Sequence, residues 1–311
     1  MKAVLPALAR PLLEPDLPAD LDIAWFTTPE EAAAMVVDAD IAWVDQQRSR
    51  TAGEIAAQGT RLKWLSTIYA GLNDFPLETL RARGVTVTNG TGINAVAVAE
   101  YAVMGMLVAA KRYDEVVRLA DQHRWTTDAP GRVELDGTSA LIVGYGTIGK
   151  LIGDRLAAFG VAVTGVTRSG RDGTLKPDQW RARLGEFDWL VLAAPSTNET
   201  RAMIGADELA AMKSSAWLIN IARGDMIDKA ALIAALDARR IAGAFLDTVD
   251  PEPLPADDPL WTAANTIHSM HLSGRSQTRM FQRAAALFLE NLNAFRAGRP
   301  MRNTVDLAAG Y

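Results

Sequence analysis

A glycine-rich segment in the middle of the chain has the residue types and spacing that bind phosphate groups. Gly144-Tyr145-Gly146-Thr147-Ile148-Gly149 follows the apolar run Leu141-Ile142-Val143 and precedes a helical pattern from Lys150 to Phe159. Glycines at these positions permit a tight turn, close approach of the backbone to a pyrophosphate, and close packing of the helix on the strand. The unpaired N–H groups at the helix N-terminus would face the phosphate oxygens. Because the segment lies between a predicted strand and a predicted helix, it indicates a dinucleotide site rather than a turn that binds nothing.

The residues after the next predicted strand indicate which nicotinamide dinucleotide binds. An acidic residue about 20 positions after the fingerprint normally accepts hydrogen bonds from the ribose hydroxyls of NAD. Here the strand over residues 161–166 runs into Thr167-Arg168-Ser169-Gly170-Arg171, and the first acid after the strand is Asp172. A guanidinium and a hydroxyl bind a 2′-phosphate, whereas a carboxylate repels it. We therefore expect a preference for NADP(H), with NAD(H) possible; the alternative is that these arginines are solvated turn residues.

Composition narrows the class of protein. The 311 residues are 49% hydrophobic and 22% charged, as in an ordinary globular protein long enough for two domains. The net charge of −5 comes without a block of like charge, so neither nucleic acid nor an anionic membrane is expected as the main partner. Cysteine is absent, which excludes disulfides and thiolate chemistry, and no His/carboxylate cluster has metal-ligand spacing, so we expect no metal. The N-terminal residues do not resemble a signal peptide, and we expect a cytoplasmic protein.

Predicted strands and helices alternate along most of the chain, which favours parallel sheets built from β-α-β units. The strands expected besides those flanking the fingerprint cover residues 41–44, 65–68, 85–87, 189–192, 216–219 and 242–246, and the helices cover residues 29–37, 77–83, 207–212, 228–239 and 277–296. The apolar stretch from Val96 to Ala110 contains Glu100 and ends at Lys111-Arg112, so it is too short to span a membrane. We interpret residues 94–119 as one long buried helix.

Three polar segments each follow, or contain the end of, a predicted strand. They are Asn220 to Gly224, Asp247 to Leu254 and Asn265 to Gly274. Open α/β sheets bind their ligands at the carboxyl ends of the strands. We therefore expect the chemistry to lie at that edge of the sheet.

These segments, taken with the fingerprint, resemble the D-2-hydroxyacid dehydrogenase family over nearly the whole chain. Three further family motifs occur in order, at Met212-Lys213 to Arg223-Gly224, Leu246-Asp247 to Glu252-Pro253, and His271 to Gly274. The segment from Val85 to Glu100 is similar to the family's crossover into its cofactor domain. Four motifs in the family's order identify the resemblance far more specifically than one motif alone.

The resemblance implies an α/β fold of two Rossmann-like, doubly wound parallel-sheet domains. Residues 1–92 plus 277–311 would form a flavodoxin-like substrate domain, and residues 93–276 would form the dinucleotide-binding domain inserted into it. The resemblance and the apolar 94–119 segment also lead us to expect a homodimer.

The resemblance implies a catalytic set of Arg223, Glu252 and His271. A guanidinium fork suits the carboxylate and the polarised carbonyl of a 2-keto acid. An imidazolium can protonate the nascent alkoxide near neutral pH, and a neighbouring carboxylate favours the protonated ring. The nicotinamide would supply the hydride. His268 falls inside a predicted strand and His123 belongs to no motif, so we expect both to be structural.

The resemblance also assigns residues to substrate and cofactor. The loop from Ile68 to Asp74 stands where the family commonly has Gly-(Val/Ile)-Asp. Tyr69, Ala70, Gly71 and Arg223 are expected to bind the substrate, and the backbone N–H groups around Ala70 and Gly71 could hold its carboxylate. Met270 stands where the family usually has Pro, which indicates a less rigid loop or a more apolar wall. The residues expected to bind the cofactor are Gly144, Tyr145, Gly146, Thr147, Ile148, Gly149, Thr167, Arg168, Ser169, Arg171, Ala194, Pro195, Thr200, Ala222 and Asp247.

We therefore expect an NADP(H)-preferring reductase of small 2-keto acids, similar to the glyoxylate/hydroxypyruvate reductase branch. Two alternatives stay open. One is an NAD-dependent dehydrogenase of a larger or phosphorylated 2-hydroxy acid, and the other is a non-catalytic NAD(P)H-sensing protein similar to the family's corepressors. The presence of Arg223, Glu252 and His271 together argues against pure sensing.

Overall fold

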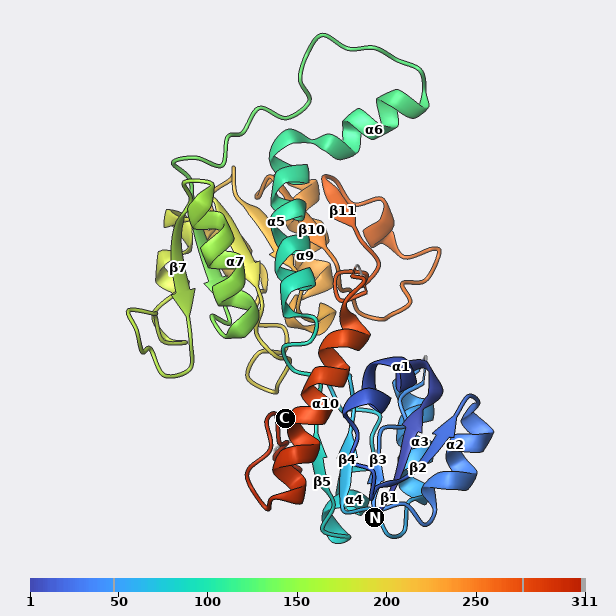
Figure 1. Ribbon diagram of the computed structural model, residues 1–311. Coiled ribbons are helices and arrows are strands. Elements are labelled where there is room, and N and C mark those ends of the chain that lie inside the picture. Colours follow the sequence, from blue (N-terminus) through green and yellow to red (C-terminus); the bar gives the residue numbers. More distant parts are fainter. Residues whose placement is uncertain (47, 276, 309–311) are drawn as a thin grey trace. The chain divides into compact units, whose positions relative to one another are not determined.

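The computed structural model describes residues 1–46, 48–275 and 277–308, and it divides the chain into two compact units (Figure 1). Unit 1 comprises Met1–Asn94 with Gln277–Tyr311, and unit 2 comprises Ala95–Ser276. Each unit contains one sheet in which every pair of neighbouring strands is parallel. The expectation of two doubly wound α/β domains is confirmed.

Unit 1 has a five-stranded sheet in the order β2-β1-β3-β4-β5, the flavodoxin-like order. The strands are β1 (Lys2–Pro6), β2 (Asp22–Phe26), β3 (Ile41–Ala42), β4 (Trp64–Ser66) and β5 (Thr86–Thr88). Helices α2 (Pro29–Val36), α3 (Ser49–Gln58) and α4 (Leu77–Ala82) supply apolar residues to one core cluster, whereas α1 (Arg10–Leu13) and α10 (Met280–Arg296) supply them to the other. In that second cluster the ring of Phe288 stacks on Trp43 and Trp64, with centroid distances of 5.7 and 4.9 Å.

Unit 2 has a six-stranded sheet in the order β11-β10-β9-β8-β6-β7. The strands are β6 (Ser139–Val143), β7 (Ala162–Val166), β8 (Trp189–Leu192), β9 (Trp217–Asn220), β10 (Gly243–Leu246) and β11 (Thr266–His268). Helices α5 (Ala95–Lys111) and α7 (Thr147–Ala158) pack in one core cluster, and α8 (Ala206–Ala211) and α9 (Lys229–Asp237) pack in the other. The strand order reverses between β6 and β8, and such a switch point is where doubly wound sheets bind ligands.

The expectation of one long helix over residues 94–119 is wrong. Helix α5 ends at Lys111, and a separate helix, α6 (Tyr113–Asp121), changes direction after it (Figure 1). Arg112 at the break has the left-handed backbone angle φ = 47°. Its guanidinium forms ion pairs with Asp114 and Glu115 and lies 5.7 Å from the centroid of the Trp217 ring. These contacts offset the cost of a left-handed conformation in a residue with a Cβ, and both sides of the break keep a helical pattern in the sequence.

The apolar helix α5 is too short to cross a bilayer, and so is every other helix in the described part of the chain.

Candidate active site

The glycine turn after β6 has the geometry that the fingerprint predicts. Gly144 has φ = 98°, and a Cβ on it would lie 2.3 Å from the backbone nitrogen of Ala194. A Cβ on Gly149 would lie 2.4 Å from the carbonyl oxygen of Gly144. Gly146 is the N-cap of α7, and a Cβ there would meet no atom within 4 Å. The first and third glycines are therefore required by packing, and the second borders open space at a helix N-terminus, which fits a pyrophosphate.

Tyr145, an expected cofactor residue, turns its side chain into the protein. A Cβ on Gly153 or Gly165 would lie 2.5 or 2.4 Å from atoms of the Tyr145 side chain, so the ring packs between α7 and β7. Burial and the nearby charge of Asp154 raise the pKa of its hydroxyl. Only its main chain borders the glycine turn, where its N–H donates to the oxygen of Val166 at 2.8 Å.

The loop after β7 is closed by its own hydrogen bonds. The hydroxyls of Thr167 and Thr174 lie 2.7 Å apart, and the Thr167 oxygen accepts from the N–H of Gly170 at 3.0 Å. The Thr167 hydroxyl is thus engaged within the loop. The remaining candidates for a 2′-phosphate are exposed at the surface: Arg168, Ser169 and Arg171.

The loop after β8 lies against the glycine turn, because Ala194 contacts the position of the Gly144 Cβ. The Thr200 hydroxyl donates to the carbonyl of Pro195 and accepts from the N–H of Thr197, both at 2.8 Å. The Ser196 hydroxyl donates to Asp225 at 2.7 Å. These bonds fix the shape of the loop from Pro195 to Thr200, and Ala194 lies directly beside the glycine turn.

Arg223 stands on a turn that a buried asparagine holds. Asn220, the last residue of β9, is fully buried; its amide nitrogen donates to the carbonyl of Arg223 at 2.9 Å and its amide oxygen accepts from the N–H of Ala222 at 3.0 Å. A Cβ on Gly224 would lie 1.9 Å from the carbonyl carbon of Val249, so the turn lies directly against the segment after β10. The Arg223 guanidinium donates to the carbonyl of Ala222 at 2.7 Å, and the residue is exposed. The sequence analysis did not assign this role to Asn220.

His271 and Glu252 form a hydrogen-bonded pair. The Nδ1 atom of His271 lies 2.7 Å from Oε2 of Glu252, and Oε1 of Glu252 accepts from the N–H of Val249 at 3.1 Å. Partial burial disfavours ionisation of Glu252, but the bonds from His271 and Val249 and the charge of Arg223 outweigh it and lower its pKa. The carboxylate is thus ionised and accepts a hydrogen bond from the Nδ1–H group, which leaves Nε2 for a reacting group. The positive charge of Arg223 therefore acts on the same Glu252 carboxylate to which His271 is hydrogen-bonded.

Asp247 holds the loop that carries His271. Its carboxylate is buried and its Oδ1 accepts from the Ser269 hydroxyl at 2.8 Å and from the N–H groups of Leu272 and Ser273 at 3.0 and 3.3 Å. Its backbone oxygen accepts from the N–H of His271 at 2.5 Å. The structure therefore shows Asp247 bonded to the loop that carries His271. Any bond to a nicotinamide carboxamide would be additional to these.

The backbone conformation at Met270 explains why this position does not hold the proline that is usual in the family. Met270 and His271 have φ angles of 55° and 54°. Proline is restricted to φ near about −65° and cannot adopt this conformation. The Met270 side chain is 64% exposed, so it forms an apolar surface next to His271.

The other two histidines lie outside this arrangement. The Nε2 atom of His268 lies 3.0 Å from the carbonyl oxygen of Leu260, its ring packs against Trp261, and burial lowers its pKa. His123 is exposed after the end of α6. Across the described residues, no group of three His, Cys, Asp or Glu side chains is arranged to hold a metal ion.

In unit 1, the loop after β4 contains the expected substrate residues. The Tyr69 hydroxyl donates to the carbonyl of Gln46, the Tyr69 carbonyl accepts from the N–H of Gly90 at 3.0 Å, and the Ala70 carbonyl accepts from the amide of Asn89 at 2.9 Å. Ala70 and Gly71 are exposed.

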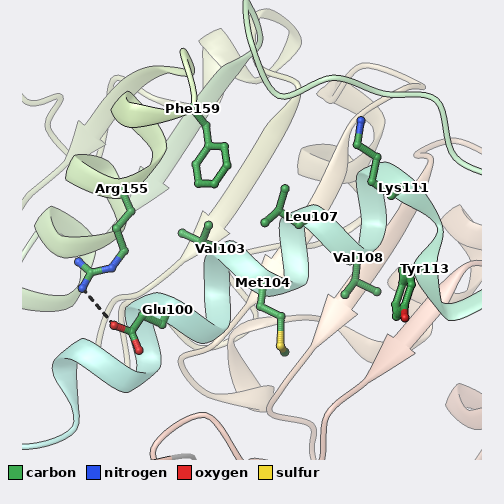
Figure 2. Close-up of a pocket in the computed structure, with 9 residues that line it drawn as sticks. All are labelled: Glu100, Val103, Met104, Leu107, Val108, Lys111, Tyr113, Arg155 and Phe159. Carbon is green, nitrogen blue, oxygen red and sulfur yellow. Dashed lines mark ion pairs between the residues drawn. The ribbon is translucent and has the colours of Figure 1, made fainter. Parts of the chain in front are cut away.

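Unit 2 also has an apolar groove of about 460 Å³ along one side of α5 (Figure 2). It is lined by Glu100, Val103, Met104, Leu107, Val108, Lys111, Tyr113, Arg155 and Phe159. None of these residues is among the predicted site residues, and Arg155 and Phe159 lie at the opposite end of α7 from the glycine turn.

A family model, a curated relative and a solved structure all relate this chain to the same protein family. Residues 103–273 match the family model described as the NAD binding domain of D-isomer specific 2-hydroxyacid dehydrogenases. The chain is 33% identical to a glyoxylate/hydroxypyruvate reductase B of Yersinia pestis over 79% of this chain and 78% of the relative. It is 27% identical to a D-3-phosphoglycerate dehydrogenase of Methanocaldococcus jannaschii, covering 93% of this chain but 56% of that longer protein. A D-isomer specific 2-hydroxyacid dehydrogenase family protein from Aeromonas salmonicida superposes with a TM-score of 0.88 at 28% identity, over 98% of this chain and 99% of that one.

Proposed function

We propose that this chain, which belongs to the D-isomer specific 2-hydroxyacid dehydrogenase family, reduces small 2-keto acids to 2-hydroxy acids with NADPH. Membership makes it an oxidoreductase with a dinucleotide-binding domain. The observation that carries the rest of the proposal is the 2.7 Å His271–Glu252 pair, with the charge of Arg223 acting on the same carboxylate. A proton donor and a cation are thereby assembled on the segments that follow β9, β10 and β11, at the carboxyl edge where β6 enters the glycine turn.

Arg223, His271 and Glu252 then have distinct roles in the reaction. The Arg223 guanidinium binds the substrate carboxylate and polarises the keto oxygen. A dihydronicotinamide, when bound, would supply the hydride that reduction of the keto acid needs. Protonated His271 gives the Nε2 proton to the oxygen of C2, which completes the 2-hydroxy acid and leaves a neutral ring. Glu252 keeps the proton on Nδ1 throughout and stabilises the charged ring before the transfer.

The residues around the glycine turn fit a dinucleotide. Gly146 leaves open space at the N-terminus of α7, where backbone N–H groups would hold the pyrophosphate. Arg168, Ser169 and Arg171 would hold the 2′-phosphate of NADPH, and Ala194, Pro195, Thr200 and Ala222 would border the rest of the cofactor.

The choice of NADPH over NADH predicts the effect of replacing Arg168. A charge-assisted hydrogen bond to a phosphate is a strong contact, so Arg168→Ala should lower kcat/KM for NADPH by about 10- to 100-fold. The value for NADH, which lacks the 2′-phosphate, should not change. Steady-state kinetics with both cofactors measure this. Arg183→Ala is the matched control, because Arg183 is an exposed unit 2 arginine paired with Glu186 on the surface. A wild-type protein that prefers NADH would contradict the assignment and favour the NAD-dependent alternative.

The substrate is proposed to be small, such as glyoxylate or hydroxypyruvate, as the Yersinia pestis relative's name suggests. The competing class is a phosphorylated hydroxy acid, as in the name of the Methanocaldococcus relative. A spectrophotometric panel of glyoxylate, hydroxypyruvate, pyruvate and bulkier or phosphorylated keto acids separates the two. Tight NADPH binding without turnover on any of them would favour the sensing alternative.

We also propose a homodimer, with a second copy of the chain covering the apolar groove along α5. The groove exposes Met104, which is 40% exposed, and the segment after α6 of the same chain exposes Trp125 almost fully. A second copy would bury both the groove and Trp125. Large exposed apolar patches in proteins commonly mark such protein–protein interfaces. Met104→Glu would bury an unpaired carboxylate there and should yield monomers in light scattering. Leu8→Glu, at a more exposed apolar residue in unit 1, should leave the mass of the wild type unchanged. A monomeric wild type would refute this proposal.

A further inference from the structure

Asp45 has a partly buried carboxylate to which no part of the proposed mechanism assigns a task. It follows β3 and accepts hydrogen bonds from three donors in unit 1: the Trp43 indole N–H at 2.6 Å, the Thr67 hydroxyl at 2.5 Å and the Ile68 backbone N–H at 2.6 Å. The Thr67 oxygen in turn accepts from the N–H of Tyr69 at 3.2 Å. Asp45 is therefore the centre of a network that fixes the first residues of the loop after β4.

The same loop is held from its other side by the segment after β5. Besides the bonds from Asn89 and Gly90 described above, a Cβ on Gly90 would lie 1.9 Å from the carbonyl oxygen of Ile68, so the two backbones are in direct contact. The exposed part of the loop is Ala70-Gly71. Within the described residues, the N–H groups of Ala70 and Gly71 donate no hydrogen bond. Two adjacent exposed N–H groups on a fixed backbone are a suitable site for a carboxylate.

Ionisation of the Asp45 carboxyl destabilises the folded state, because burial disfavours the charged form. Burial raises the pKa of Asp45 to about 6, even though its three donors act to lower it. Across the described residues no basic side chain forms an ion pair with Asp45 to offset that cost. Above pH 6 the group is nevertheless ionised, and hydrogen bonds to a charged acceptor are stronger than those between neutral groups.

We propose that Asp45 is a positioning residue for the substrate: it holds Thr67 and Ile68 so that the N–H groups of Ala70 and Gly71 bind the carboxylate of the 2-keto acid. This inference rests on the proposed reductase activity. Asp45 itself does not touch the substrate. Its loss should therefore weaken keto acid binding and leave NADPH binding, which depends on unit 2, unchanged.

The test compares three variants with the wild type in steady-state kinetics and NADPH titration. Asp45→Ala removes all three acceptor bonds and should raise KM for the keto acid by about tenfold or more, with the Kd for NADPH unchanged. Asp45→Asn should restore most of the affinity, because its oxygen can accept from Trp43 and Ile68 while its amide donates to Thr67. Asp38→Ala, at an exposed aspartate of unit 1 that pairs with Lys2, is the matched control and should match the wild type.

Each outcome bears on the inference. A folded Asp45→Ala variant with wild-type KM, or one that loses NADPH affinity to the same extent, would overturn it. If Asp45→Ala does not fold, Thr67→Val removes the two bonds of the Thr67 hydroxyl, to Asp45 and from Tyr69, and an unchanged KM in that variant would overturn it equally. A wild type without turnover on any 2-keto acid would refute the proposed function instead, so the two failures are distinguishable.

Discussion

Replacement of His271 by alanine should reduce kcat with NADPH and glyoxylate by about three orders of magnitude, the middle of the range for loss of a general acid. The proton that Nε2 gives to the keto oxygen would have to come from water. The dissociation constant for NADPH, measured by fluorescence titration, should not change. The reason is structural: the ring is bonded to Glu252 at 2.7 Å, and the glycine turn is built from β6, α7 and the loop after β8 without it.

His268→Ala is the control for this experiment. His268 lies three residues earlier, at the end of β11, and its ring is bonded to the carbonyl of Leu260 and packs on Trp261. Its loss should lower the melting temperature and leave kcat near the wild-type value. If His271→Ala retained its activity, or if His268→Ala were the inactive variant, the assignment of the proton donor would be wrong.

The parts of the fold that the sequence predicts well depend on local rules. The glycine turn is one, because a positive φ at Gly144 and the 2.4 Å approach of the Gly149 position to Gly144 leave little choice of residue. The helix expected over residues 228–239 is another: it corresponds to α9, and the side chain of Asp228 caps it by accepting from the N–H of Ala231. Edge strand β2 is not among the predicted strands, although four of its five residues, Ile23 to Phe26, are apolar.

The parts that the sequence does not predict depend on contacts between distant residues. The turn at Arg112 is stabilised partly by a hydrogen bond to Asn265, 153 residues away, which no local pattern encodes. Asp45 acquires its environment from Thr67 and Ile68, which lie 22 and 23 residues further along the chain. Asn220 was part of a motif, but its bracing of Arg223 follows only from the turn geometry. The proposed catalytic residues follow from the ordered motifs, whereas the contacts that hold them follow only from the structure.

At Arg223, we expect activity to depend on both the charge and the shape of the side chain. One guanidinium nitrogen is already bonded to the carbonyl of Ala222 at 2.7 Å, which orients the fork and leaves the other N–H groups for the substrate. A substrate carboxylate and a developing alkoxide each need a donor, and the removal of one such electrostatic contact typically costs about 100- to 1,000-fold in rate. Arg223→Ala removes both contacts, so we expect kcat/KM to fall by at least about 1,000-fold, with NADPH binding retained.

Arg223→Lys discriminates between a need for positive charge and a need for the planar fork. An ammonium supplies charge but cannot bind a carboxylate in the bidentate geometry of arginine, so lysine should recover only a small part of the lost kcat/KM. Added guanidinium ion, which has the shape of the missing group, should restore measurable turnover to Arg223→Ala and have no such effect on Arg223→Lys. Arg201→Ala is the control, since Arg201 is an exposed arginine of unit 2 that lies 3.5 Å from Asp225. Full activity of Arg223→Lys would show that a point charge suffices, and the bidentate role would have to be abandoned.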